Sequence, residues 1–264
     1  MYPSGHAHPA SLQALGVPMA AAQVLAACAC AEQLAATPLR DALALRVFEH
    51  LGGRLEHFDA VELGRAAFRT MVVDYLVRDY FDRAPDGLGV GVWPVLGTRA
   101  HRLTEPRWVD VDAPAVAALR RMLLPERPGW LQLGSCPANV QWLDAVCGKS
   151  NRPLLLVLDE GALPLSAESL ARFLEAASCR LPAGSELIVA HEVGMVKMPA
   201  SGPPRAPVEL LLRSPRGVGE VALYPRLRWQ SPDTSPEPLR RFLDAVSLPS
   251  GSDHAPGIAH WIVI

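Results

Sequence analysis

Residues 87–114, GLGVGVWPVLGTRAHRLTEPRWVDVDAP, contain the pattern that decides the fold. The apolar run over residues 88–96 predicts a strand, and a turn and a short helix beginning near Thr98 follow it. A second strand is expected over residues 108–111, with the acidic residue Asp112 at its tip. A strand, a helix and a second strand in this order begin a doubly wound α/β sheet, which binds nucleosides beyond the carboxyl ends of its strands. Asp112 is therefore placed to accept hydrogen bonds from ribose hydroxyls.

The alternation of strands and helices continues after this stretch. Residues 129–133, 154–158 and 187–190 predict three further strands, and the run LLLVL over residues 154–158 is typical of a strand buried on both faces. The rest of the chain alternates like antiparallel strands, with segments expected at residues 208–213, 218–224, 227–229 and 261–264. The C-terminal third is therefore expected to be rich in β-structure.

The residues before the first strand have the pattern of helices. Two helical patterns are separated at Thr37-Pro38, where Thr37 is expected to cap the second helix and Pro38 to take its first position. Another helix is expected over residues 61–81. We therefore expect a helical cap over residues 1–85, laid over the ligand edge of the sheet. Residues 86–264 would form the α/β core with a β-rich substrate region, and the two parts would make one compact unit.

Composition and charge exclude several classes of protein. Half of the residues are hydrophobic and 20% are charged, which is typical of a globular chain. The formal net charge of −2 gives no electrostatic reason to expect nucleic acid or a membrane as a partner. Five cysteines, an odd number, and a polar N-terminus without the features of a secretory signal favour the cytoplasm. Cys28 and Cys30 have no companion pair, so we interpret them as buried thiols and expect no metal site.

Four short motifs follow one another along the chain at compatible spacing. They are Arg69-Thr70 with Asp74, Thr98-Arg99 with Arg102-Leu103, Trp108 with Asp110, Asp112 and Pro114, and Arg152-Pro153 with Glu160-Gly161. With these motifs, residues 18–190 resemble the leucine carboxyl methyltransferase family, and within it the bacterial polyketide O-methyltransferases. The resemblance implies an α/β fold of the class I methyltransferase-like (Rossmann-like) type, a doubly wound sheet with an N-terminal helical cap and a β-rich C-terminal tail. It also implies S-adenosylmethionine as the cofactor.

The glycine motif of that family is eroded in this chain. The family carries Leu-Gly-x-Gly-Leu-Asp-Thr-Arg, whose glycines let the backbone approach the cofactor closely. Aligned without gaps, these glycines fall on Trp93 and Val95, and the aspartate falls on Gly97. A gapped alignment instead recovers Gly89 and Gly91, at the cost of four extra residues in the turn.

The resemblance implies cofactor contacts along the carboxyl edge of the sheet. Arg69 matches the position that holds the carboxylate of the cofactor, and a solvated helix arginine is the alternative interpretation. Asp112 is either a ribose ligand or a helix cap, and Glu160 is either a site residue or a turn acid. Arg99 and Arg102 are expected to form ion pairs that hold the fold. The remaining expected cofactor contacts are Gly89, Gly91, Gly97, Gly134 and Ser135.

Two classes of function remain open. The first is an S-adenosylmethionine-dependent O-methyltransferase-like enzyme that acts on a carboxylate or hydroxyl of a small, polyketide-like secondary metabolite, free or bound to a carrier protein. His191, at the end of the fifth predicted strand, is then the candidate general base for a hydroxyl acceptor, and a structural histidine is the alternative. The second is a repurposed methyltransferase-fold protein without the cofactor, acting as a lyase, decarboxylase, hydrolase, cyclase or binding protein. The sequence identifies neither the substrate nor the oligomeric state.

Overall fold

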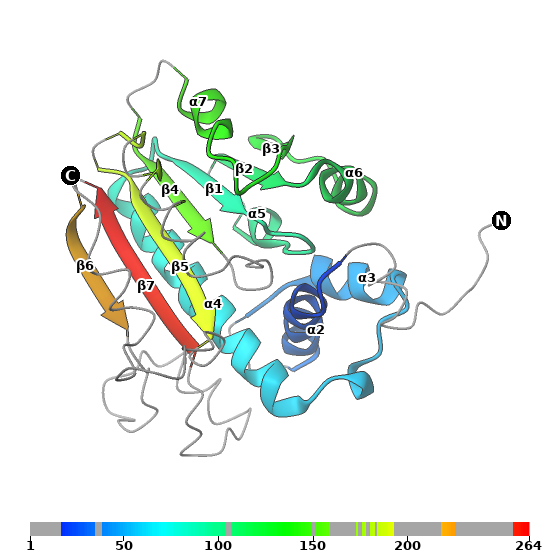
Figure 1. Cartoon of the computed structure of the whole chain (residues 1–264). Helices are drawn as coiled ribbons and strands as arrows, with labels where there is room; N and C mark the ends of the chain where they lie inside the picture. Colours follow the sequence, from blue (N-terminus) through cyan, green and yellow to red (C-terminus); the bar gives the residue numbers. More distant parts are fainter. Residues whose placement is uncertain are drawn as a thin grey trace, which may run out of the picture.

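A seven-stranded sheet forms the centre of the protein (Figure 1). The computed structural model describes residues 17–34, 39–103, 107–148, 152–158, 173, 176–177, 180–182, 184–192, 218–224 and 256–263. The strands are β1 (Leu88–Val92), β2 (Arg107–Asp112), β3 (Trp130–Gly134), β4 (Leu154–Leu158), β5 (Glu186–Glu192), β6 (Val218–Tyr224) and β7 (Pro256–Val263). Their order across the sheet is β3-β2-β1-β4-β5-β7-β6. Strands β1 to β5 are parallel, and β7 is antiparallel to both of its neighbours, β5 and β6.

Both faces of β4 are buried, as its apolar sequence predicts. Leu154, Leu156 and Leu158 belong to a core cluster on one face, together with residues of α7 (Trp142–Cys147). Leu155 and Val157 belong to the cluster on the opposite face, with residues of α4 (Ala60–Arg83) and α5 (Arg99–Arg102). Each fully buried leucine contributes about 1.5–3 kcal/mol to folding. The alternation fixes the register of β4, because a shift by one residue would exchange its two faces.

The N-terminal helices lie beyond the carboxyl ends of the central strands. α2 (Met19–Gln33), α3 (Ala42–His50) and the first part of α4 share one core cluster with Val95 and Leu96, the residues that follow β1. In Figure 1, α2 and α3 lie past the arrowheads of β1 and β4. α2 is rich in alanine, which favours the helix and allows close packing against its neighbours. Cys28, in α2, is buried, as expected. The helices therefore cover the edge of the sheet where a ligand was predicted. The 3-10 helix η1 (Leu55–His57) lies between α3 and α4.

Two predicted boundaries are wrong. The first strand was expected over residues 88–96 but ends at Val92, because Trp93 and Val95 adopt φ angles of 55° and 46°. These values lie in the left-handed region, which a strand cannot include. α3 begins at Ala42, because Asp41 caps it by accepting a hydrogen bond from the backbone N–H of Ala44 at 2.9 Å. The predicted cap, Thr37-Pro38, lies outside the described residues.

The other predicted strands agree with the structure more closely. Residues 154–158 and 218–224 coincide with β4 and β6, and the second, third and fifth strands differ from prediction by one or two residues at their ends. The last strand was expected over residues 261–264 but begins at Pro256, because β7 pairs with the whole length of β5. The segments expected at residues 208–213 and 227–229 lie outside the described part of the chain. Among the helices that the structure describes, none is both long and apolar enough to cross a membrane.

Candidate functional site

The carboxyl ends of four parallel strands meet at one edge of the sheet. Val92, the last residue of β1, is paired in register with Val111 of β2 and with Leu158 of β4. Asp112, the last residue of β2, is paired with Gly134, the last residue of β3. The next backbone N–H, that of Ser135, donates to the carbonyl of Asp112 at 2.8 Å. Asp112, Gly134 and Ser135, three of the predicted contacts, are thus brought together.

The loop after β1 is held in an unusual backbone conformation. A left-handed φ is uncommon for any residue other than glycine and is a marked outlier for the β-branched Val95. The loop closes with a hydrogen bond of 2.6 Å from the N–H of Gly97 to the carbonyl of Pro94. A Cβ atom at position 97 would lie 2.9 Å from that carbonyl oxygen, so any other residue would force the turn to open. Such strain persists only when surrounding contacts enforce it.

Asp112 supplies one of these contacts. Its Oδ1 accepts a hydrogen bond of 3.2 Å from the N–H of Val95, and its Oδ2 accepts one of 3.3 Å from Nε2 of Gln132. The side chain has no solvent exposure, and burial raises the pKa of Asp112 to about 6, with Arg120 lowering it and Asp110 raising it. The first helix after β2 has Ala113 as its N-cap, without a side-chain hydrogen bond. In this conformation Asp112 therefore holds the loop and does not cap the helix.

Arg120 also holds the loop, and it was not among the site residues predicted from the sequence. It lies in α6 (Pro114–Leu123), is 1% exposed, and donates through Nη1 to the carbonyls of Val95 at 2.8 Å and Gly97 at 2.9 Å. Its Nε donates to Oε1 of Gln132 at 2.8 Å, and its Nη2 pairs with Oδ2 of Asp110 at 2.5 Å. A sequence signal existed, because Arg120 falls on the buried helix face between Ala117 and Leu124.

Asp110 connects the loop to the aromatic residues of the sheet. Besides Arg120, its carboxylate accepts hydrogen bonds of 2.8 Å from the indole N–H of Trp108 and of 2.8 Å from that of Trp130. The glycines of β1 make room for this group. A Cβ atom on Gly89 would come within 2.2 Å of the Trp108 ring, and one on Gly91 within 2.4 Å of the Asp110 carboxylate. Both glycines lie inside the strand, where packing against β2 requires them.

A separate buried cluster fastens the helices to one another. Asp74 in α4 accepts from Nε of Arg99 at 2.8 Å and from Nε of Arg102 at 2.6 Å. Arg102 also pairs with Asp41, the cap of α3, and the hydroxyl of Thr98 donates to the same carboxylate at 2.5 Å. Arg99 and Arg102 therefore form the fold-holding ion pairs that the sequence predicted.

For three predicted site residues the structure gives less information. Arg69 is buried in α4, in the part of the helix that precedes Asp74. His191 lies in β5, opposite Gly257 of β7, and its side chain is not among the described groups. Glu160 lies outside the described residues. The assignment of these three residues to one site stays a prediction.

Little space remains beside the loop in the described conformation. A cavity of about 20 Å³ lies between α2 and the end of β1, and this is enough for a single water molecule. Its lining consists of Ala21, Val24, Gly91, Trp93, Pro94, Gly97, Arg99, Ala100, Trp108 and Asp110. On the other side, the Trp93 ring lies 6.5 Å, centroid to centroid, from that of Phe173. The loop is therefore packed closely on both sides.

Known proteins resemble part of this chain in sequence and nearly the whole chain in fold. No protein-family model matches it. Over 105 residues the chain is 35% identical to the tetracenomycin polyketide synthesis O-methyltransferase TcmP of Streptomyces glaucescens. That alignment covers 39% of this chain and 38% of the length of TcmP. The chain thus shares sequence with a segment of a polyketide O-methyltransferase.

The solved structures extend the likeness to the fold. A candidate methyltransferase of Thermobifida fusca YX superposes with a TM-score of 0.50 and 15% identity, over 92% of this chain and 94% of that one. A looser likeness, with a TM-score of 0.42 and 10% identity, relates 72% of this chain to 97% of a candidate methyltransferase of Streptococcus mutans in complex with SAH. Together with the strand order and the N-terminal helices, the first of these shows that the chain has the class I methyltransferase-like α/β fold.

Proposed function

We propose that the protein is an S-adenosylmethionine-dependent O-methyltransferase-like enzyme that acts on a carboxylate or hydroxyl of a small, polyketide-like secondary metabolite. The observation that carries this proposal is the place of Asp112 at the tip of β2, where the ends of the parallel strands meet. In doubly wound sheets an acid at this position binds the ribose of a nucleoside. The partial likeness to TcmP supports methyl transfer to oxygen as the reaction.

The described conformation does not yet fit the cofactor. Both carboxylate oxygens of Asp112 are engaged inside the protein, and the N–H of Val95 is used by Oδ1. Because Asp112 has no solvent exposure, a ribose would reach it only if the residues around it moved. Gly97, Gly134 and Ser135 would then bring backbone close to the nucleoside, and Arg69 and Glu160 are proposed as further contacts. We propose the helical residues 1–85 as the cap of this site and residues 86–264 as its core, in one unit.

The residues of this chain would contribute mainly by positioning. When bound, the cofactor supplies a methyl group on a sulfonium, and the acceptor oxygen must be aligned with it. A carboxylate acceptor needs no base, whereas a hydroxyl acceptor must lose its proton. For a hydroxyl, His191 is the proposed base, and a carrier protein is a proposed means of delivering the substrate.

A second function has its own supporting observation. Trp93 and Val95 take the positions of the family's glycines in the ungapped alignment and hold left-handed backbone angles, and the Trp93 ring lies 6.5 Å, centroid to centroid, from that of Phe173. A protein that no longer uses S-adenosylmethionine would keep such a packed loop. It would serve as a lyase, decarboxylase, hydrolase, cyclase or binding protein in a biosynthetic pathway.

Titration calorimetry with S-adenosylhomocysteine distinguishes the two functions without knowledge of the substrate. The first function predicts micromolar binding, about −8 kcal/mol. Asp112→Asn and Arg69→Ala should each weaken it by about 1.5–3 kcal/mol, because each removes a charge-assisted hydrogen bond. Asp82→Asn, an exposed aspartate at the end of α4, is the matched control and should bind as the wild type does. The absence of heat and of a thermal shift at millimolar ligand would favour the second function.

A further inference from the structure

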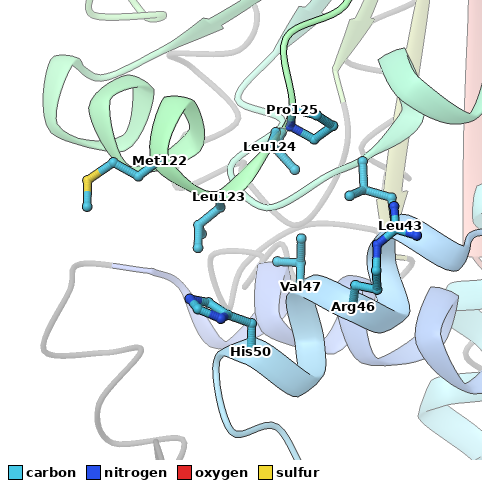
Figure 2. A pocket seen from close by; sticks show the side chains of 8 residues that line it. All are labelled: Leu43, Arg46, Val47, His50, Met122, Leu123, Leu124 and Pro125. Atoms are coloured by element: carbon cyan, nitrogen blue, oxygen red, sulfur yellow. The ribbon is translucent and has the colours of Figure 1, made fainter. Parts of the chain in front are cut away.

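A pocket of about 490 Å³ lies between α3 and the C-terminal end of α6 (Figure 2). Its volume is within the range of small-molecule sites. α6 starts directly after Asp112 at the carboxyl end of β2 and leads back toward the start of β3. The pocket is therefore at the opposite end of α6 from the candidate site. It is lined by Leu43, Arg46, Val47, His50, Met122, Leu123, Leu124 and Pro125.

One wall of the pocket is a single face of α3. Leu43, Arg46, Val47 and His50 follow the spacing i, i+3, i+4 and i+7, which places them on the same side of a helix. Figure 2 shows the Arg46 and His50 side chains on either side of Val47. The wall is thus apolar in the middle and carries a basic side chain on each flank.

The other wall is apolar and partly open to solvent. Leu124 is buried, whereas the Met122 side chain is 83% exposed at the rim. In Figure 2 the Leu123 side chain points toward α3, whereas the Met122 side chain lies at the outer edge of the pocket. An exposed methionine beside a hollow is an apolar surface that a ligand would cover, and methionine adapts readily to ligands of different shape.

The charges of the pocket are of one sign. Of the residues that the structure describes, Arg46 and His50 are the ionisable ones that line the pocket, and no described acidic side chain lines it. Among the described residues, neither Arg46 nor His50 has a hydrogen-bond or ion-pair partner. Arginine binds carboxylates through two parallel hydrogen bonds. The chemistry that matches an apolar pocket with such a flank is an apolar chain that ends in a carboxylate.

We propose that this pocket binds a small amphipathic carboxylate, with its chain between Val47 and Leu123 and its head group against Arg46 and His50. None of the lining residues is a predicted cofactor contact, and the pocket does not depend on methyl transfer. The natural ligand would be a medium-chain carboxylic acid or a metabolite with the same two parts.

Calorimetric titration of the full chain with decanoate, decanol and decylamine, each below its aggregation concentration, tests the proposal. Decanoate should bind at least tenfold more tightly than decanol, and decylamine should bind more weakly still. R46Q should weaken decanoate binding about tenfold or more, the effect of one lost charge-assisted pair, and H50Q should weaken it less. R121Q removes an exposed arginine of α6 that does not line the pocket, and it should leave the affinity unchanged.

A charge placed on the apolar rim provides a second test. M122E introduces a carboxylate at an exposed position, where folding should tolerate it, and should weaken decanoate while leaving decylamine unaffected or improved. Equal binding of decanoate and decanol would overturn the proposal, as would equal losses in R46Q and R121Q. So would full decanoate binding in the R46Q/H50Q double variant.

Discussion

Two buried carboxylates, Asp74 and Asp112, lie in the same small protein core but in opposite electrostatic settings. Asp74 accepts hydrogen bonds from two arginines, Arg99 and Arg102. Burial alone would raise the pKa of Asp74, but these two cations hold it below the usual 3.8. Asp112 has a single arginine at 3.5 Å, Arg120, which makes a shorter contact of 2.5 Å with Asp110. Burial therefore prevails at Asp112 and raises its pKa to about 6.

The contrast separates an acid that holds the fold from one that is suited to a ligand. The charge of Asp74 is fully compensated inside the protein, so nothing further needs to bind it. The charge of Asp112 is compensated only in part, because Arg120 is shared with Asp110 and the other partners are the backbone N–H of Val95 and the amide of Gln132. Carboxyl groups with raised pKa values cluster at functional sites, although structural networks also produce them. The comparison supports the choice of Asp112 as the central residue of the candidate site.

The largest effect is expected for Arg120→Met, which would remove the cation shared by Asp110 and Asp112. The substitution leaves two buried carboxylates, Asp110 and Asp112, without their cation and two loop carbonyls without a donor. It should lower the free energy of unfolding by about 3–5 kcal/mol. Urea denaturation measures this, with Arg121→Met on the exposed side of the same helix as a control that should change stability by less than about 0.5 kcal/mol. Equal effects of the two substitutions would contradict the assigned role of Arg120.

Asp74→Ala would break the ion pairs that Asp74 makes with Arg99 and Arg102. Removal of the carboxylate leaves Arg99 and Arg102 buried with one acid, Asp41, remaining near them. The expected loss of unfolding free energy is about 3 kcal/mol. The control is Asp79→Ala in the same helix, because Asp79 pairs with Arg83 at the surface and such pairs contribute about 0–1 kcal/mol. A loss of less than 1 kcal/mol for Asp74→Ala would show that the ion pairs do not hold the helices together.

The pH dependence of stability should have opposite signs for the two acids. A folded pKa raised from 3.8 to about 6 means that Asp112 favours the folded state below pH 4 and loses this contribution as the pH rises to 6. The full difference corresponds to about 3 kcal/mol. For Asp74 the lowered pKa has the reverse effect, and its contribution is lost as the pH falls below 4. Urea denaturation from pH 4 to 7 should therefore show wild type losing stability relative to Asp112→Asn; a constant difference would contradict the raised pKa.

The smallest effect is expected for Gly97→Ala, which tests how tightly the loop after β1 is packed. The added Cβ would lie 2.9 Å from the carbonyl oxygen of Pro94, so the turn must open slightly. The carbonyl of Gly97 would then move away from Arg120. A loss of about 1 kcal/mol is expected, together with faster hydrogen exchange at Val95. Gly148→Ala, at a site with free space for a Cβ but a left-handed φ, serves as a control for backbone strain alone.

Most of the sheet and the place of Asp112 in the candidate site could be predicted from the sequence. The apolar run of β4 and the acid at the tip of β2 were visible because both depend on local order along the chain. The end of β1 was missed because Pro94 and Val95 continue an apolar pattern, and the left-handed turn is enforced by contacts from β2 and α6. Arg120 was missed as a site residue for the same reason. Its partners lie up to 25 residues away in sequence and meet only when the sheet forms.

The most direct test of the central claim is a carboxyl carbon NMR titration that follows Asp112 and Asp74 in the same sample. We expect Asp112 to titrate at a pKa of about 6 and Asp74 to titrate below 3.8. The Asp112→Asn variant assigns the first resonance by removing it. If the pKa of Asp112 were instead equal to or below that of Asp74, the charge of Asp112 would be compensated within the fold. Asp112 would then no longer differ from Asp74 in the way that a ligand-binding acid should.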